Sequence, residues 1–514
     1  MLIGALLVVG VILILAVVFS ISDNLIQIEA QKEGIDTVNN NLSLVPSIAD
    51  LFGKQAPAYA DASRFHALKK GHDIKITGSA GSALHQANVT RYAVKPGDYR
   101  GNAPIPKMTV AEGDSVKAGD ELFFDKANPN IKYVAPVSGE VIEIRRGAKR
   151  SISHVVILAD KEQQYKSYDL PSLENADRDE LVSFLQASGA WAHINQRPYD
   201  LVADTNTVPQ NIFISTFNTA PLATDLNLVA EGNDAHFQKG IDVLNKLTSG
   251  KVYLGMDGRG ITKPSSAYLN ATGVQKEWFS GKHPAGNVGV QIHHTAPIRG
   301  LNSVWTLKPE SVITIGRLFN EGIYSTEKVV SIVGGQIAEP KNVKTSMGAS
   351  IAELVADNIK PEDKTRLIEG DVLTGIKAEA DEFLSLKSNQ ITAIKEGDNY
   401  ELFGWLLALS PRPSVSRTFP NFLLKNHEFD ANTNTHGEER AFVVSGQYEK
   451  VTPMDIYPQH LMKAIMTGEI EKMEALGINE LSEEDLALAE FTCTSKQPLQ
   501  SILREGLDMM REQA

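Results

Sequence analysis

The side chains that most often perform catalysis or bind metals occur here singly or with unsuitable spacing. Cys493 is the only cysteine, so an intramolecular disulfide and any iron–sulfur or zinc site held by several cysteines of this chain are excluded. With no histidine nearby in sequence, Cys493 is expected to be a core thiol. His293 and His294 are adjacent, and on a strand their rings would point apart and suit one ion poorly. His283, followed by Pro-Ala-Gly, is expected to pack in a turn. The sequence therefore predicts no metal site and no catalytic residue.

Two short motifs resemble cofactor sites. Asp125-Lys126-Ala127 is the tripeptide that carries the modified lysine in lipoyl domains, so a lipoylated Lys126 is the alternative to a solvated turn residue. The Asn128-Pro-Asn130 that follows favours the turn. Gly255-Met-Asp-Gly258-Arg-Gly260 follows a predicted strand, but its spacing differs from the Gly-x-Gly-x-x-Gly dinucleotide fingerprint. We expect a tight turn there. No Gly-x-Ser-x-Gly nucleophile elbow of the usual kind occurs.

Length and composition indicate a multidomain globular protein. The chain has 514 residues, 42% hydrophobic and 22% charged, with a formal net charge of −13. At about 100–200 residues per domain, three to five domains are expected. This composition excludes wholesale disorder and a polytopic membrane protein, and the acidic balance argues against nucleic acid as a partner.

The N-terminus has the pattern of a membrane anchor. Residues 1–22 carry no charge, and twenty apolar helical residues span about 30 Å, the thickness of a bilayer core. We predict a single-pass transmembrane helix over 1–22 and a linker over 23–66. A cleaved signal peptide is the alternative, although no basic residue precedes the run. The helix holds no ionisable group that could conduct an ion. Lys32, the nearest basic residue, favours a cytoplasmic C-terminal side.

The body is predicted to be an α/β multidomain protein. Short strands and Gly-Asp turns over 67–160 resemble the barrel-sandwich fold of biotinyl and lipoyl domains, including a half-buried strand with alternating residues over 141–145. Strands at 211–216 and 251–255 flank a helix at 235–247, which predicts a Rossmann-like α/β domain over 161–320. Residues 321–395 predict a β-grasp (SLBB-like) module with a helix capped near Ser350. Residues 396–514 are predicted to be mixed and then helical, with one helix over 458–476 and another capped by Ser482.

An ordered set of motifs identifies a family. From about residue 67 to the C-terminus, the chain is similar to the A subunit of the sodium-translocating NADH:quinone oxidoreductase. The resemblance rests on the following motifs: Leu68-Lys-Lys-Gly71 to Gly78, Phe123 to Pro129, Ala135-Pro-Val-Ser-Gly139, Arg146-Gly-Ala-Lys-Arg150, Gln196-Arg-Pro-Tyr199, Asn218-Thr-Ala-Pro-Leu222, Gly281-Lys-His-Pro-Ala-Gly286, Met347-Gly-Ala-Ser350 and Glu401-Leu-Phe-Gly-Trp405.

The resemblance implies one component of a six-subunit bacterial inner-membrane complex that oxidises NADH, reduces ubiquinone or menaquinone, and expels Na⁺. It places NADH and the flavins on the other five subunits. The family resembles the flavin and iron–sulfur component of respiratory complex I and a component of the Rnf complex, without their cofactors. The membrane-embedded B subunit is the chief expected partner, membrane lipid is adjacent, and the body is expected on the cytoplasmic side. The alternative is a membrane-anchored scaffold or docking subunit without quinone affinity.

The resemblance also implies a quinone site. The segments that match the stretches implicated in quinone binding are 93–102 and 191–199. A quinone needs an apolar slot and donors to its two carbonyl oxygens. Side chains of these types within the two segments are Tyr99, Arg100, Trp191, His193, Arg197 and Tyr199. Packing of Tyr99 in a loop and a domain contact at Arg197-Pro198 are the structural alternatives.

Overall fold

The computed structural model describes residues 56–100, 105–300, 302–361, 363–401, 403–404, 411–416, 421–424 and 426–513, with Val18, Ser22, Leu25 and Glu29. The predicted anchor at 1–22 therefore falls, apart from Val18 and Ser22, outside the described residues. Among the residues that are described, no helix has the length and apolar character needed to cross a membrane. The chain forms two compact units, Met1–Pro57 and Ala58–Ala514, and the second contains every element below.

The first region of the body consists of two small antiparallel sheets, with strand orders β3-β9-β8-β5 and β4-β6-β7. The predicted strand over 141–145 forms, but a β-bulge between Val141 and Glu143 interrupts its alternation. Val141 is fully buried, whereas Ile142 is 39% exposed. The elements are β3 (Arg91–Val94), η2 (Pro96–Asp98), β4 (Pro106–Met108), β5 (Ser115–Val116), β6 (Glu121–Asp125), β7 (Lys132–Val134), β8 (Gly139–Arg146), η3 (Ala148–Arg150) and β9 (Ile152–Ala159).

The second region is a seven-stranded sheet with order β1-β14-β13-β12-β15-β10-β11. The first five strands are parallel, β10 is antiparallel to β15, and β11 is antiparallel to β10. The strands predicted at 211–216 and 251–255 and the helix predicted at 235–247 are confirmed within two residues. The strands are β1 (Phe65–Ala67), β10 (Asn195–Arg197), β11 (Leu201–Val202), β12 (Asn211–Ser215), β13 (Val252–Asp257), β14 (Gln275–Ser280) and β15 (Val304–Leu307).

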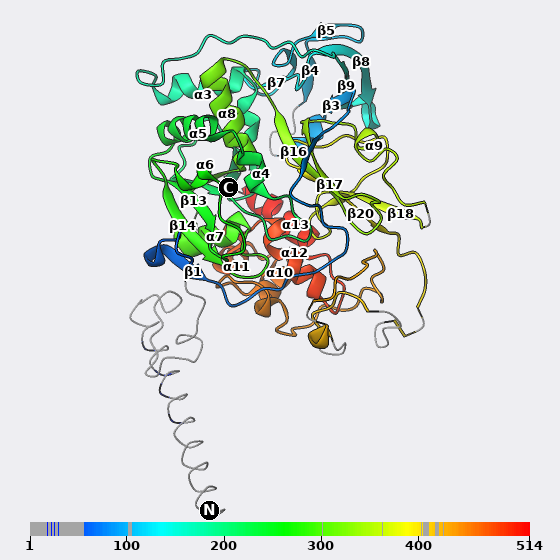
Figure 1. The fold of residues 1–514 in the computed structure, drawn as a ribbon. Coiled ribbons are helices and arrows are strands. Elements are labelled where there is room, and N and C mark those ends of the chain that lie inside the picture. Colours follow the sequence, from blue (N-terminus) through cyan, green and yellow to red (C-terminus); the bar gives the residue numbers. More distant parts are fainter. Residues whose placement is uncertain are drawn as a thin grey trace, which may run out of the picture. The chain divides into compact units, whose positions relative to one another are not determined.

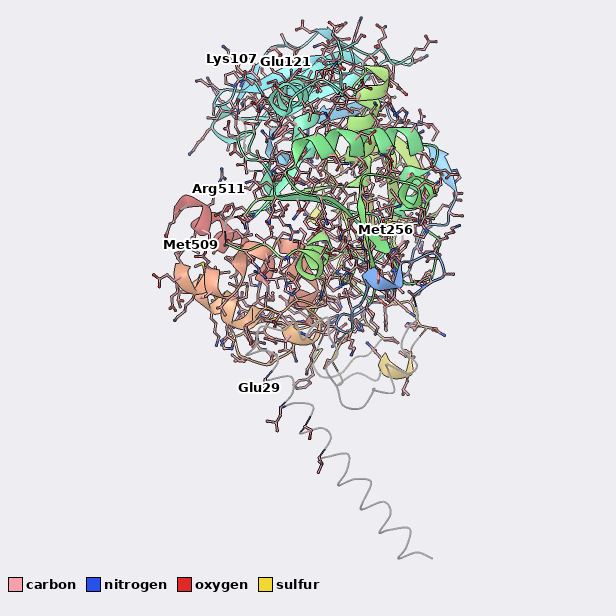
Figure 2. All side chains as sticks on the ribbon, turned by 90° about the vertical axis from the view of Figure 1, so that its left-hand side faces the viewer. Glu29, Lys107, Glu121, Met256, Met509 and Arg511 are labelled. Carbon is pink, nitrogen blue, oxygen red and sulfur yellow. The ribbon has the colours of Figure 1, made fainter. Side chains whose placement is uncertain are left out.

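Helices cover this sheet, with α5 and α8 side by side (Figure 1). They approach closely because glycine stands at their contact: a Cβ on Gly240 would lie 2.2 Å from the carbonyl oxygen of Val312. Figure 2 shows Met256 among the side chains packed around the sheet, and it is fully buried. The helices are η1 (Ala62–Arg64), α3 (Arg178–Ala187), η4 (Ala190–His193), α4 (Leu226–Ala230), α5 (Asp234–Leu247), α6 (Ser266–Leu269), α7 (Val288–Thr295) and α8 (Pro309–Glu321).

The third region is a mixed six-stranded sheet with order β19-β18-β20-β16-β17-β2. β16 and β17 form an antiparallel pair, and β20 joins β16 in parallel. The helix predicted near Ser350 is confirmed as α9 (Ile351–Leu354), with Ser350 at its N-cap. The strands are β2 (Leu84–Gln86), β16 (Glu327–Val333), β17 (Lys341–Ser346), β18 (Thr365–Glu369), β19 (Ile376–Lys377) and β20 (Gln390–Lys395).

The start of the body links these regions. β1 pairs with β14 in the seven-stranded sheet, and β2 pairs with β17 in the six-stranded sheet. The chain enters the two small sheets only after these pairings, at β3 (Figure 1). The regions also share one continuous cluster of buried apolar side chains.

The C-terminal region ends in helices, and its apolar cluster also includes Ile74, Ile76 and Val290 from earlier in the chain. The single helix predicted over 458–476 is wrong: α10 ends at Met466 and α11 begins at Ile470, because Gly468 adopts a left-handed φ of +69° between them. The predicted cap is confirmed, since Ser482 and Asp485 form a capping box. Cys493 is a core thiol, with Sγ 2.8 Å from the hydroxyl of Tyr448. The elements are η5 (Asn421–Leu423), η6 (Tyr448–Lys450), α10 (Pro458–Met466), α11 (Ile470–Ala475), η7 (Ile478–Glu480), α12 (Glu483–Thr492) and α13 (Leu499–Gln513).

Candidate functional site

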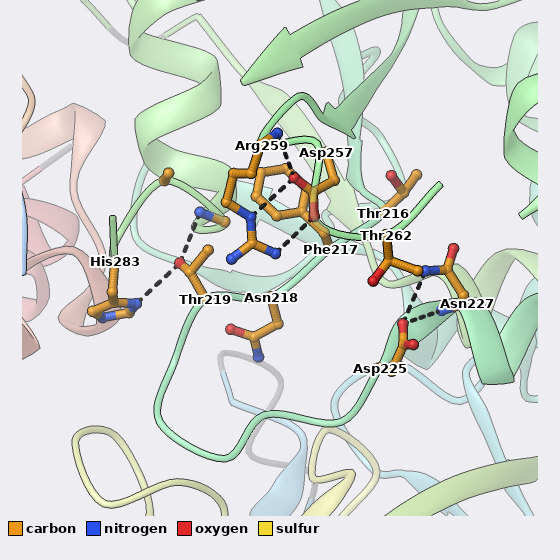
Figure 3. A network of polar contacts seen from close by, with 12 residues as sticks. Thr216, Phe217, Asn218, Thr219, Asp225, Asn227, Asp257, Arg259, Thr262 and His283 are labelled. Atoms are coloured by element: carbon orange, nitrogen blue, oxygen red, sulfur yellow. Dashed lines mark hydrogen bonds and ion pairs between the residues drawn. The ribbon is translucent and has the colours of Figure 1, made fainter. Parts of the chain in front are cut away.

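The carboxyl ends of the parallel strands are the first place to look for a ligand site. β12 lies between β13 and β15, so the chain leaves β12 in one direction and later returns on its other side. Open α/β sheets usually bind ligands at such a point. Three loops that contain motifs of the family resemblance meet here: the loops that follow β1, β12 and β14. His283 donates its backbone N–H to Asp73 at 2.9 Å, and Thr219 Oγ1 lies 3.1 Å from His283 Nδ1 (Figure 3).

The chain's own side chains occupy this edge. Arg259 donates two hydrogen bonds to Asp257, at 2.9 and 2.7 Å, and its guanidinium lies 5.3 Å from the ring centre of Phe217 (Figure 3). A Cβ on Gly258 would lie 2.8 Å from the ring of Phe65. The loop after β13 is therefore closed by the Arg259–Asp257 pair and by the rings of Phe217 and Phe65.

The three histidines considered in the sequence, His283, His293 and His294, make contacts within the fold. His283 is 3% exposed, and burial lowers its pKa to about 4, so the ring is neutral. His293 and His294 lie in the last turn of α7, not on a strand as predicted. His293 pairs with Glu480 at 2.8 Å, and His294 Nε2 lies 2.6 Å from a backbone carbonyl. Among the described residues, no three His, Cys, Asp or Glu side chains are grouped to hold a metal ion.

Two of the six predicted quinone residues, Arg197 and Arg100, contact the first turn of α12. Arg197 is 1% exposed and donates to Asp485, Glu484 and Ser482 at 2.9, 3.0 and 2.7 Å. Asp485 and Glu484 favour the charged form, and they keep the pKa of Arg197 above its ordinary value despite its burial.

Arg100 lies at the same turn, and Tyr199 is linked to it through Arg504 of α13, whose guanidinium lies 3.6 Å from Glu483. Arg100 forms an ion pair with Glu483, and the carbonyl oxygen of Arg100 accepts the N–H of Val202 at 2.9 Å. The carbonyl oxygen of Tyr199 accepts a hydrogen bond from Arg504 at 2.9 Å. The two predicted segments, which are distant in the chain, are thus joined at one place.

Tyr99 and His193 form a second group around Tyr324. His193 contacts the hydroxyls of Ser311 and Tyr324 at 3.2 and 3.0 Å, and burial lowers its pKa to about 3. Tyr99 is 4% exposed, its ring centre lies 4.4 Å from that of Tyr133, and burial together with Tyr324 raises its pKa. Trp191 is separate from both groups: it is fully buried, and its indole N–H donates to a backbone carbonyl at 2.8 Å.

Buried charges that sequence reasoning missed lie beside these groups. Lys95 donates to the carbonyl of Phe383 at 2.6 Å, and Lys328 donates to that of Leu386 at 3.0 Å. Burial raises the pKa of Asp98 to about 6 and lowers that of Lys328 to about 8. No pattern in the sequence could have revealed these residues, because their contacts join distant segments.

Two hollows of the described surface lie elsewhere. One of about 680 Å³ lies between the β18–β19 turn and the helices α12 and α13, with Arg412, His436 and Cys493 in its lining. Another of about 320 Å³ lies beside Tyr59 and Trp278. Neither lining includes any of the six predicted quinone residues.

Together these features define a class: a multidomain α/β protein whose barrel-sandwich, parallel α/β and mixed-sheet regions meet around buried ion pairs. Family models match the chain in the same order. They are the NqrA N-terminal barrel-sandwich hybrid domain at residues 66–160, the NqrA second alpha/beta domain at 176–324, and the NQRA C-terminal domain at 329–380.

Curated relatives agree with these models. The A subunit of the Na(+)-translocating NADH-quinone reductase of Alcanivorax borkumensis is 40% identical over 86% of this chain and 98% of its own length. Its counterpart from Vibrio atlanticus is 37% identical over 87% of this chain and 99% of its own length. The chain belongs to the NqrA family, whose members are components of the Na(+)-translocating NADH-quinone reductase, an oxidoreductase complex. The family predicted from the motifs is thereby confirmed.

Among solved structures, a NAD+-reducing [NiFe]-hydrogenase chain in the air-oxidized state aligns with 66% of this chain and 64% of its own. The identity is 11% and the TM-score 0.32, too slight a likeness to inform fold or function.

Proposed function

We propose that this chain docks on the membrane subunits of a sodium-pumping NADH:quinone reductase and binds quinone at the junction formed by Arg100, Arg197 and Tyr199. NADH and the flavins belong to other subunits, and this chain contributes no redox cofactor. The observation that supports the proposal is that Arg100 and Arg197, which are distant in the chain, both contact the first turn of α12.

The side chains of the junction divide into two roles in this proposal. Arg197 is committed to the carboxylates of α12, so it acts as a positioning residue. The side chain of Arg100 is 47% exposed and is available as a donor to a quinone carbonyl. The hydroxyl of Tyr199 is buried and has no hydrogen-bond partner among the described residues, so it is the second donor. Tyr99, Trp191 and His193 hold the surrounding core in place.

The membrane attachment is also part of the proposal. The apolar residues 1–22 anchor the chain in the bacterial inner membrane, the body lies on the cytoplasmic side, and the chief partner is the membrane-embedded B subunit. The division into 1–22, 23–66, 67–160, 161–320, 321–395 and 396–514 describes the arrangement that we propose. Alkaline carbonate extraction of native membranes tests the anchor, because a spanning helix resists it and a peripheral contact does not.

A quinone titration tests the proposed site. Short-chain ubiquinone added to the full chain should quench tryptophan fluorescence saturably, and Tyr199→Phe and Arg100→Gln should each weaken binding about tenfold. Tyr400→Phe is the matched control, because that ring is fully exposed. Saturable binding that neither variant alters would place the quinone elsewhere.

A scaffold without quinone affinity is the second candidate. Arg197, His193 and Trp191 are already engaged in internal contacts, and the two hollows do not include them, which favours this alternative. Under it, the titration would show no saturable quenching while the chain still co-purified with its partner subunits.

A further inference from the structure

The hairpin between β8 and β9 ends in a basic tip that the proposed quinone site does not use. Three side chains, Arg146, Lys149 and Arg150, form this basic tip, and all three are exposed. The chain as a whole carries a net charge of −13, so the basic tip is a positively charged site on a negatively charged protein. In the part of the chain that the structure describes, no carboxylate pairs with any of the three side chains.

The neighbouring arginine shows the contrast. Arg145, at the base of the hairpin, pairs with Glu143 at 3.3 Å and with Asp381 at 3.5 Å. It is neutralised within the body. The basic tip lies beyond these carboxylates, and its three charged side chains are exposed.

Two consecutive residues of the basic tip have a backbone conformation that is uncommon for residues other than glycine. Lys149 and Arg150 both adopt a left-handed φ, at 53° and 61°, where glycine or asparagine would be less strained. Hydrogen bonds hold the turn: Gly147 N–H donates to the carbonyl of Ser151 at 2.8 Å, and the Ser151 hydroxyl donates to the carbonyl of Ala148 at 2.8 Å. Ser151 N–H also donates to the carbonyl of Ala148 at 3.1 Å, so this is a two-residue hairpin turn whose central residues both have a positive φ, and it fixes where the two basic side chains project.

The geometry points to an acidic protein surface as the partner, and we propose that the basic tip docks on carboxylates of another component of the complex. A pre-ordered turn lowers the entropy cost of binding a rigid acceptor, and guanidinium groups match carboxylates in two-point contacts. A lipid surface is mobile and would not require the charges to be held in one arrangement. This inference rests on the docking part of the proposed function and is independent of quinone binding.

Charge reversal within the complex tests the inference. The variant Arg146→Glu/Lys149→Glu/Arg150→Glu should bind the remaining subunits at least tenfold more weakly than the unaltered chain at about 0.1 M salt. The difference should shrink towards 1 M salt, where screening shortens electrostatic range to about 3 Å. The matched control is Lys117→Glu/Lys126→Glu/Lys161→Glu, which changes the same charge at exposed sites of the same region. Circular dichroism and melting temperature should be unchanged in both variants.

The outcomes separate the two proposals. If the charge-reversed variant and the control variant bind the remaining subunits equally well at every salt concentration, the role of the basic tip is overturned. If the charge-reversed variant no longer floats with anionic phospholipid vesicles but still binds the other subunits, the proposed protein partner is overturned in favour of lipid. If the unaltered chain fails to co-purify with the rest of the complex, the docking part of the proposed function is overturned as well.

Discussion

Replacement of Arg197 by methionine should weaken the packing of α12 against the α/β region. The guanidinium and the Asp485 carboxylate are 2.9 Å apart, and their side chains are 2% and 0% exposed. Methionine keeps much of the apolar stem but leaves Asp485 charged, buried and without its cation. Breaking a buried pair in this way costs about 3–5 kcal/mol. The ion pair with Glu484 adds little to this figure, because that side chain is 40% exposed.

Hydrogen exchange measures this effect locally, which suits a multidomain chain whose unfolding is not a single step. A loss of about 3–5 kcal/mol corresponds to exchange of the α12 amides roughly 150- to 5000-fold faster. The double variant Arg197→Met/Asp485→Asn should be protected better than Arg197→Met alone, because position 485 no longer holds a buried carboxylate without its cation and the asparagine side chain can still accept a hydrogen bond from Ser482. Lys364→Met is the control, since its pair with Asp398 is exposed on both sides.

The reasoning would be refuted if Arg197→Met left the protection of α12 unchanged, or if the effects of the two substitutions were simply additive. The same variant also informs the quinone proposal. An intact α12 combined with lost quinone binding would make Arg197 a direct ligand, not a positioning residue.

Three further predictions concern the core. Phe237→Ala should destabilise the α/β region by about 3–5 kcal/mol, measured by denaturant unfolding, because the ring is fully buried. Gly240→Ala should lower the melting temperature although alanine favours helices, because its Cβ would meet the carbonyl of Val312 at 2.2 Å; an unchanged or higher melting temperature would contradict the close approach of α5 and α8. The folded body should lose about 2 kcal/mol from His193 between pH 6.5 and 5, since burial lowers its pKa to about 3 and only the unfolded chain takes up the proton. His193→Gln should melt with a weaker dependence on pH over this range, and an unaltered dependence would contradict the assignment.

Local sequence signals predicted the elements that depend on nearby residues. The apolar spacing over 235–247 produces α5, and Ser482 begins α12 as its capping pattern indicates. The errors arose where a local preference competed with another constraint. Gly468 divides a helix that looks continuous in its apolar pattern, and a β-bulge in β8 exposes Ile142.

The candidate site was predictable only in its residue types. Tyr99, Arg100, Arg197 and Tyr199 were selected from two segments, and the structure joins those segments. The role of each side chain was not predictable. Burial of Arg197 depends on carboxylates that approach only after the C-terminal helices have docked.

The sequence by itself determined the order of the regions, the family and the absence of a multi-cysteine cluster, because composition, periodicity and motif order are properties of the linear chain. Tertiary structure alone decided which charges are paired. Arg197 and Asp485 are separated by 288 positions, and His193 and Tyr324 by 131. Such contacts depend on sheet order and domain packing, and nothing within a few residues of either partner specifies them.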